Sequence, residues 1–233
     1  MFLGVDGYLN GWCCCVLNEN ITIQLHDNLN SIIKSHTSVK CVFIDMPIGL
    51  SSQKFSRKVD QEIRKLLPNN KKGSVFTPPC REALLEKSYK EANVTNKDIT
   101  SKGISIQSWN LHKKINELDN LLINDLSSRS IIHESHPELC FLKFNESNPL
   151  ESNKKTKEGI KQRIEIIEKE IKNIGEILNN TMDKFRGSKV KVDDILDAII
   201  LAISAKKWKE NGSRVLTQLN TLDEKNIPVS IYY

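Results

Sequence analysis

Carboxylates stand at the ends of strands that the sequence predicts. Asp6 closes the apolar run that begins at residue 2, Asp45 follows the apolar run 41–44, and Glu134 ends the run 130–134. In a parallel or mixed sheet, neighbouring strands that end together bring their last side chains to one crevice. We therefore expect these three acids to lie near one another.

A late helix expected over residues 192–208 adds two more acids. Asp194 and Asp197 are three residues apart and share one helix face. Several carboxylates in a partly desolvated place repel one another and require a proton or a divalent cation. Oxygen donors suit Mg²⁺ or Mn²⁺, and two such ions about 4 Å apart are used for attack of water on a phosphodiester. Taken singly, each acid fits a plainer role as a turn former or helix cap.

The first fifty residues read as β-β-β-α-β. The sequence predicts strands at 2–6, 12–17, 21–25 and 41–44, with an amphipathic helix at 27–36 before the last of them. This order predicts an α/β protein with a mixed sheet and flanking helices.

Residues 52–128 are charged, poor in strand patterns and helical in period, with a loop at 71–79. We interpret them as a helical insertion in a single domain that spans 1–233. Isoleucines at alternating spacings of four and three predict one long helix over 157–182. Their stripe at 160–178 is a candidate homodimer face, although packing on the sheet is the favoured role. A strand is expected at 227–233.

Composition does not indicate the function, but it bears on the partners and the cellular compartment of the protein. The chain has 233 residues, 34 Lys and Arg against 29 Asp and Glu, and a net charge of +5, which permits an anionic partner. No run approaches the roughly 20 apolar residues of a membrane span, and the first residues lack the pattern of a signal peptide. The six cysteines have no framework spacing. We expect reduced, mostly buried thiols in a cytoplasmic protein with no membrane association.

The order of elements and the acid placement resemble the ribonuclease H-like fold, and the closing Asp194-x-x-Asp197-Ala198 helix resembles its RuvC-type resolvase branch. More closely, the chain resembles the family called domain of unknown function 429, whose members are predicted to be ribonuclease H-like nucleases. The motifs that carry this resemblance span most of the chain: Gly4-Val5-Asp6-Gly7 with Gly11-Trp12, Ile44-Asp45-Met46-Pro47-Ile48-Gly49-Leu50, Arg57-x-x-Asp60-x-x-x-Arg64, Ser74-Val75-Phe76-x-Pro78-x-x-Arg81, Gly103-Ile104-Ser105-x-Gln107, Glu134-x-His136-Pro137-Glu138-x-x-Phe141, Lys154-Lys155-Thr156-x-x-Gly159-x-x-x-Arg163 and Asp194-x-x-Asp197-Ala198.

The resemblance implies a site and an activity. Asp6, Asp45, Asp194 and Asp197 would be the ligands of two Mg²⁺ or Mn²⁺ ions, with Asp6 bridging them and Glu134 as the additional catalytic acid. The implied activity is two-metal hydrolysis of nucleic acid.

Basic residues near these motifs are candidate substrate-binding groups: Arg57, Arg64, Arg81, Lys154, Lys155 and Arg163. They would bind the backbone of an anionic substrate or stabilise a pentavalent phosphate. For any single Lys, a solvated helix face is the plainer interpretation. Arg57 and Arg64 are favoured because seven residues separate them, which turns them the same way on a helix.

His136 is a candidate proton shuttle beside the acids. The alternative is a zinc cluster His133-x-x-His136-x-x-x-Cys140, which lacks a fourth ligand at a suitable spacing.

Two other classes of function stay open. The first is a non-catalytic or regulatory binding protein that keeps the fold and the acids. The second is an actin-like ATP-dependent phosphotransferase, which is disfavoured because the turn 7–11 has no Ser or Thr for a phosphate loop.

Overall fold

The structure is a computed structural model that describes residues 1–212 and 215–233, without the side chains of 217–221. It divides into two compact units. The first comprises Met1–Asp45, Ile131–Arg214 and Tyr232–Tyr233, and the second comprises Met46–Ser130 and Val215–Ile231. The segment predicted as an insertion falls within the second unit.

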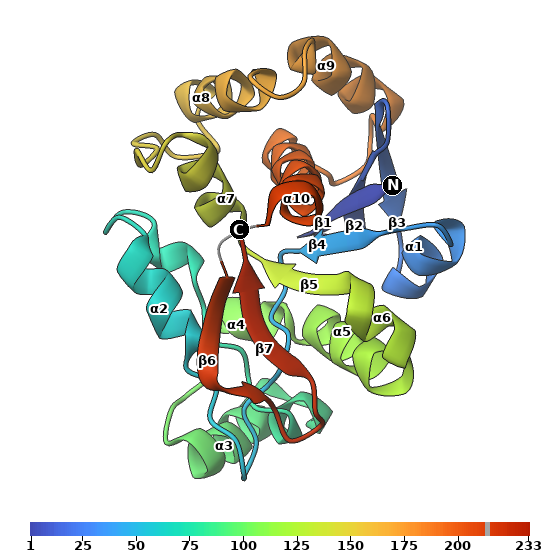
Figure 1. Cartoon of the computed structure of the whole chain (residues 1–233). Coiled ribbons are helices and arrows are strands. Elements are labelled where there is room, and N and C mark those ends of the chain that lie inside the picture. The colour runs from blue at the N-terminus through green and yellow to red at the C-terminus, as the bar shows by residue number, and fades with distance from the viewer. Residues whose placement is uncertain (213–214) are drawn as a thin grey trace. The chain divides into compact units, whose positions relative to one another are not determined.

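The first unit contains a mixed five-strand arrangement, so the α/β class is confirmed (Figure 1). The strands stand in the order β3-β2-β1-β4-β5. β1 is antiparallel to β2 and β2 to β3, whereas β1 and β4, like β4 and β5, are parallel. The bounds are β1 Phe2–Tyr8, β2 Gly11–Leu17, β3 Ile21–His26, α1 Leu29–Ser35, β4 Cys41–Ile44 and β5 Ile132–Ser135. The predicted β-β-β-α-β order is therefore present.

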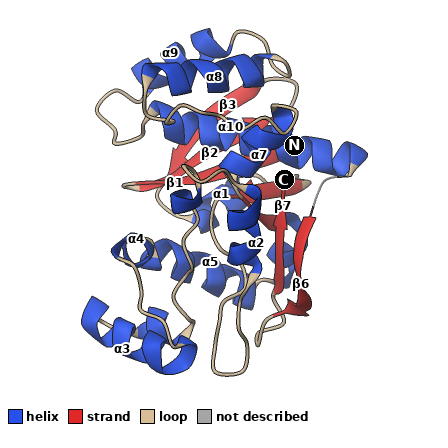
Figure 2. Ribbon diagram, turned by 90° about the vertical axis from the view of Figure 1, so that its left-hand side faces the viewer, coloured by secondary structure: helices blue, strands red, loops and turns tan. Residues whose placement is uncertain are grey.

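Helix α10 (Val192–Asn211) is the centre of this unit. It packs on β1, β2 and β4. It also contacts α7 (Pro137–Phe144), α8 (Lys157–Glu168) and α9 (Ile174–Lys184). In Figure 2, α8 and α9 lie on the side of α10 that is turned away from β1. Every residue from 195 to 205 is buried, as expected for a helix that is covered on several sides.

A glycine permits the closest contact of α10 with the sheet. A Cβ at Gly4 would lie 2.0 Å from the carbonyl oxygen of Ala198 and 2.3 Å from the nitrogen of Ala202. Real atoms cannot approach so closely, so β1 and α10 can be this near only because residue 4 has no side chain.

The prediction of one long helix over 157–182 was wrong. The structure has two helices, α8 (Lys157–Glu168) and α9 (Ile174–Lys184). Asn173 lies between them with φ of 61°, a left-handed conformation that an α-helix cannot pass through. Ile167 and Ile174 from the isoleucine stripe are fully buried inside the chain. The homodimer stays a prediction.

The second unit is mainly helical up to residue 124. Its helices begin with α2 (Val59–Leu66) and α3 (Tyr89–Thr100), and the helical pattern around Trp109 is divided at Leu111. The C-terminal strand expected at 227–233 is present as β7, whereas β6 was not predicted. The remaining bounds are α4 Ile106–Asn110, α5 His112–Asn124, α6 Leu126–Ile131, β6 Val215–Leu222 and β7 Pro228–Tyr232, with short 3₁₀ turns at Lys72–Ser74 and Glu82–Leu85.

A buried ion-pair network joins distant segments of the second unit. The Arg81 guanidinium donates to both carboxylate oxygens of Asp119 at 2.8 Å and to Asp223 at 2.5 Å. Asp223 in turn accepts from the backbone of Leu50 and Ile227. A charge-assisted pair of this kind is stable only while all partners are present, so Arg81 has a clear structural role.

Candidate acidic site

Two of the predicted acids lie side by side on the sheet. The register pairs Gly4 with Phe43, and Asp6 and Asp45 each lie two residues further along, so they share a level and a face. The backbone N–H of Asp45 donates to the carbonyl of Val5 at 3.0 Å and extends this alignment past the end of β4. Because Gly4 contacts α10, this face is the one that α10 covers.

α10 contributes Asp197 near its N-terminus, with only 1% of its surface exposed. Its Oδ2 accepts a hydrogen bond from Lys154 Nζ at 2.5 Å. Its Oδ1 is buried and has no hydrogen-bond partner in the described part of the chain. We call Asp6, Asp45, Asp197 and Lys154 the acidic site.

The pKa values indicate that these carboxylates repel one another. Burial, followed by the charges of Asp45 and Asp197, raises the pKa of Asp6 well above its ordinary value. Burial and the charge of Asp197 raise the pKa of Asp45 to about 7. Burial also raises the pKa of Asp197, although Lys154 opposes this. Desolvation and like charge act in the same direction here, so the site carries more negative charge than its one ammonium offsets.

Lys154 was predicted to bind substrate, and the structure places it among the acids. Burial alone would lower the pKa of its ammonium, but the charges of Asp197, Asp6 and Asp45 raise it above its ordinary value. Asp193 lies 3.9 Å from the same ammonium. No spacing of residues indicates this contact beforehand, because Lys154 is in a loop before α8.

Asp194 faces a different partner. Its Oδ2 accepts the backbone N–H of Lys191 at 2.8 Å, the contact of a helix cap. Burial raises its pKa, and this hydrogen bond opposes the increase. The cap role considered from the sequence is therefore present, and Asp194 holds the first turn of α10 that carries Asp197.

Glu134 lies in β5 beside Ile44. Strand alternation places it on the opposite face from His133, whose ring contacts Trp208 of α10 at 4.8 Å between centroids. Its charge nevertheless raises the pKa of Asp45. Glu134 thus acts on the acidic site through its charge, although its side chain lies on the face of the sheet that is turned away from α10.

Glu138 and Arg163 form a buried pair that sequence reasoning missed. Arg163 Nη2 donates to Glu138 Oε1 at 2.5 Å, and its guanidinium lies 5.0 Å from the ring centre of Phe141. Arg163, expected to bind substrate, has no exposed surface. The charge of Glu138 also raises the pKa of Asp45 and Asp197. The motif Glu134-x-His136-Pro137-Glu138 was the available signal for Glu138.

The histidines do not form a zinc cluster with Cys140. His133 packs among Phe43, Trp208 and Tyr232, and burial lowers its pKa to about 4. His136 is buried at the start of α7. Across the described residues, no three His, Cys, Asp or Glu side chains are arranged to hold a metal ion. All six cysteines are buried and free, as predicted.

The remaining basic residues that were predicted to bind substrate lie outside the acidic site. Lys155 is exposed, and Arg81 is held in its ion-pair network. Arg57 precedes α2, so the argument from helical spacing was wrong for it and Arg64. Both arginines nevertheless line one cavity of the second unit.

The fold and these contacts define a mixed α/β protein with a buried carboxylate cluster between two of its strands and its central helix. The family model described as "Protein of unknown function (DUF429)" matches residues 4–220, and the chain belongs to this family. Comparison with curated proteins and with solved structures gave no match. None of the helices in the described part of the chain has the length and apolar character that a membrane span requires.

Proposed function

We propose that the acidic site is the hydrolytic centre of a divalent-cation-dependent phosphodiesterase with a ribonuclease H-like fold that acts on nucleic acid. The observation that carries this proposal is the meeting of Asp6, Asp45 and Asp197 on one face. They come from β1, the end of β4 and the first turns of α10. In addition to burial, the charges of Asp45 and Asp197 raise the pKa of Asp6, and the charge of Asp197 raises the pKa of Asp45. Such perturbed groups are typical of functional sites.

The residues suit Mg²⁺ or Mn²⁺ in their chemistry. All the donors are carboxylate oxygens, which hard cations prefer. Asp197 Oδ1 is buried and has no hydrogen-bond partner among the residues that the structure describes. Because no three such side chains of the described residues are arranged around an ion, Asp6, Asp45 and Asp197 would have to draw closer together to hold the ions. The ions would then activate water and offset the charge of the phosphate. Because Asp194 caps α10, we assign it a supporting role rather than that of a principal ligand.

Lys154 orients Asp197 and offsets part of the negative charge. Its ammonium competes with any divalent cation for Asp197 Oδ2, which it already contacts. A cation that carries two charges neutralises the site more completely than one ammonium. Lys154 therefore keeps the carboxylates together before a cation binds, and Glu134 and Glu138 maintain the negative potential that attracts one.

The test is cleavage of labelled single-stranded, duplex and branched DNA and RNA with Mg²⁺ or Mn²⁺. We expect Asp6→Asn to lower the rate by at least about 100-fold, with an unchanged circular dichroism spectrum. Asp183→Asn is the matched control, since Asp183 is an exposed residue of α9 that forms an ion pair with Arg186. Cleavage that survives Asp6→Asn would show that the acidic site is not the hydrolytic centre.

A non-catalytic binding protein is the second candidate. It is favoured by the contact of Lys154 with Asp197, which makes part of the site an ion pair without any metal. In that case calorimetry would show Mn²⁺ binding that Asp197→Asn weakens, while no substrate in the panel is cleaved. An ATP-dependent phosphotransferase receives no support from the β1–β2 connection, a two-residue turn at Leu9 and Asn10.

A further inference from the structure

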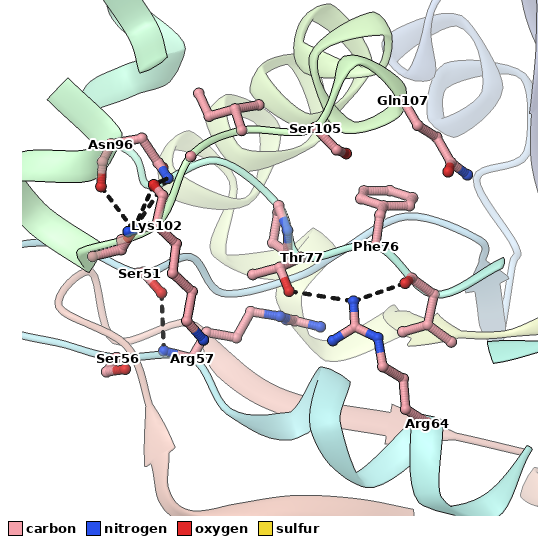
Figure 3. A pocket seen from close by; sticks show the side chains of 15 residues that line it. Ser51, Ser56, Arg57, Arg64, Phe76, Thr77, Asn96, Lys102, Ser105 and Gln107 are labelled. Carbon is pink, nitrogen blue, oxygen red and sulfur yellow. Dashed lines mark hydrogen bonds between the residues drawn. The ribbon is translucent and has the colours of Figure 1, made fainter. Parts of the chain in front are cut away.

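The second unit contains a polar cavity that the proposed function does not use. Its volume is about 340 Å³, within the range of roughly 300–1,000 Å³ that small-molecule sites occupy. The chain before α2, α2 itself, the segment 75–78 and the segment 100–107 surround it. Figure 3 shows Arg64 reaching from α2 toward Thr77, with Phe76 beside them.

Two positive charges at this cavity have no carboxylate partner in the part of the chain that the structure describes. Arg64 Nη2 donates to the carbonyl of Val75 at 2.8 Å and lies 3.5 Å from Thr77 Oγ1. Lys102 has no ion pair through its ammonium among the described residues, and none of the described lining residues is Asp or Glu. Arg57, by contrast, is neutralised by Asp60, with contacts of 2.7 and 2.9 Å. The cavity therefore carries a net charge of about +2, from Arg64 and Lys102.

The walls of the cavity are held by hydrogen bonds from buried or half-buried side chains. Asn96 Nδ2 donates to the carbonyl of Lys102 at 2.8 Å, and Asn93 Oδ1 accepts from Ile104 N at 2.8 Å. Ser108 Oγ donates to the carbonyl of Thr77 at 2.9 Å, which fixes the opposite wall. A site whose backbone is fixed in this way loses little entropy when a ligand binds.

We propose that this cavity binds a small phosphomonoester whose planar organic part packs beside Phe76. A phosphate monoester carries about −1.5 to −2 charges at pH 7, which matches the two unpaired cations. Arg64 offers a guanidinium for charge-assisted hydrogen bonds, and the hydroxyls of Thr77 and Ser105 add neutral donors at the cavity. The proposal does not depend on the acidic site, which lies in the first unit.

Isothermal titration calorimetry with phenyl phosphate and with inorganic phosphate tests this proposal on the full chain. We expect phenyl phosphate to bind more tightly than inorganic phosphate, because only the former has a ring. Arg64→Met and Lys102→Met should each weaken phenyl phosphate binding by about tenfold or more, since each removes a charged donor. Lys90→Met is the control, because Lys90 is exposed on α3 and does not line the cavity.

Lys102→Met is the more secure variant. The Lys102 ammonium holds no other segment of the described chain, whereas Arg64 also supports the loop at Val75. Equal affinity in Lys102→Met and Lys90→Met, or no binding of phenyl phosphate at all, would overturn the proposal. A second titration in the same experiment uses hexathymidylate without terminal phosphates. If it binds more tightly than phenyl phosphate and responds to the same variants, the cavity is a contact for a nucleic-acid strand and the small-ligand assignment is wrong.

Discussion

Replacing Lys154 with Met removes an ammonium that contacts the buried carboxylate of Asp197. Breaking a fully buried ion pair by deleting one partner costs about 3–5 kcal/mol. The Lys154 side chain is 33% exposed, whereas that of Asp197 is 2% exposed, so water screens part of the charge that is left behind. We therefore expect Lys154→Met to lower the free energy of unfolding by about 2 kcal/mol at pH 8.

The decrease in unfolding free energy caused by Lys154→Met should be larger at high pH than at low pH. The folded-state pKa of Asp45 is about 7, and those of Asp6 and Asp197 are also raised. An acid with a raised folded-state pKa favours the folded state at low pH and loses that contribution as pH rises through the folded-state pKa. As pH falls from 8 to 5, Asp45, whose pKa is about 7, takes up a proton, so less negative charge is left for Lys154 to offset. The loss should then be about 1 kcal/mol or smaller.

Urea unfolding at pH 5 and pH 8 measures this difference. Lys155→Met is the matched control, because Lys155 is exposed and adjacent in sequence but has no ion pair within the described residues. In the double variant Lys154→Met/Asp197→Asn, the cost should be smaller than the sum of the single costs by at least about 1 kcal/mol. Equal stability of Lys154→Met and Lys155→Met at pH 8 would refute the view that Lys154 offsets the charge of the acidic site.

Two further predictions concern the packing around α10. Gly4→Ala should destabilise the protein by about 3 kcal/mol or more in urea unfolding, because its Cβ overlaps the α10 backbone. Gly175→Ala in α9, with open space around its Cβ, should instead be neutral or stabilising by up to about 1 kcal/mol. Similar effects of the two substitutions would contradict the close contact of β1 and α10. His133 has a folded-state pKa of about 4, below its ordinary 6.5. The neutral His133 ring should therefore contribute fully to the free energy of unfolding above pH 6.5. This contribution should decline by up to about 3 kcal/mol as pH falls to 4. His133→Phe should flatten the unfolding free energy across that range, and an unchanged slope would show that another group titrates.

Local patterns predicted the elements of the first unit that have strong periodicity. β1, β2 and β4 are apolar runs and α10 has an apolar face, so period and composition sufficed to place them. The division of the helix at Asn173 was missed because the isoleucine spacing continues past it, although Asn is among the residues that adopt the left-handed conformation most readily. β6 was missed because the alternation of apolar and polar residues over Val215–Leu222 is weak.

The site was predictable to the extent that it follows sheet topology. Asp6 and Asp45 meet because parallel register aligns them, and Asp197 joins them because α10 packs on β1. The contacts of Lys154 and Arg163 were not predictable, because both depend on how the chain before and within α8 returns to the core. Arg57 and Arg64 line one cavity, yet through loop geometry rather than the helical spacing that suggested it.

The place of α10 late in the chain affects how the protein is made. Cys13 pairs with Asp6 and Cys15 with Gly4, so both thiols face α10. A ribosome that adds about 5–20 residues per second needs about 7–30 s to travel from β4 to α10, which begins about 150 residues later. During that interval the nascent sheet lacks the helix that covers this face. The two thiols, which are inert once folded, are then accessible to oxidants and alkylating agents, and a thiol modified at that stage would hinder the docking of α10.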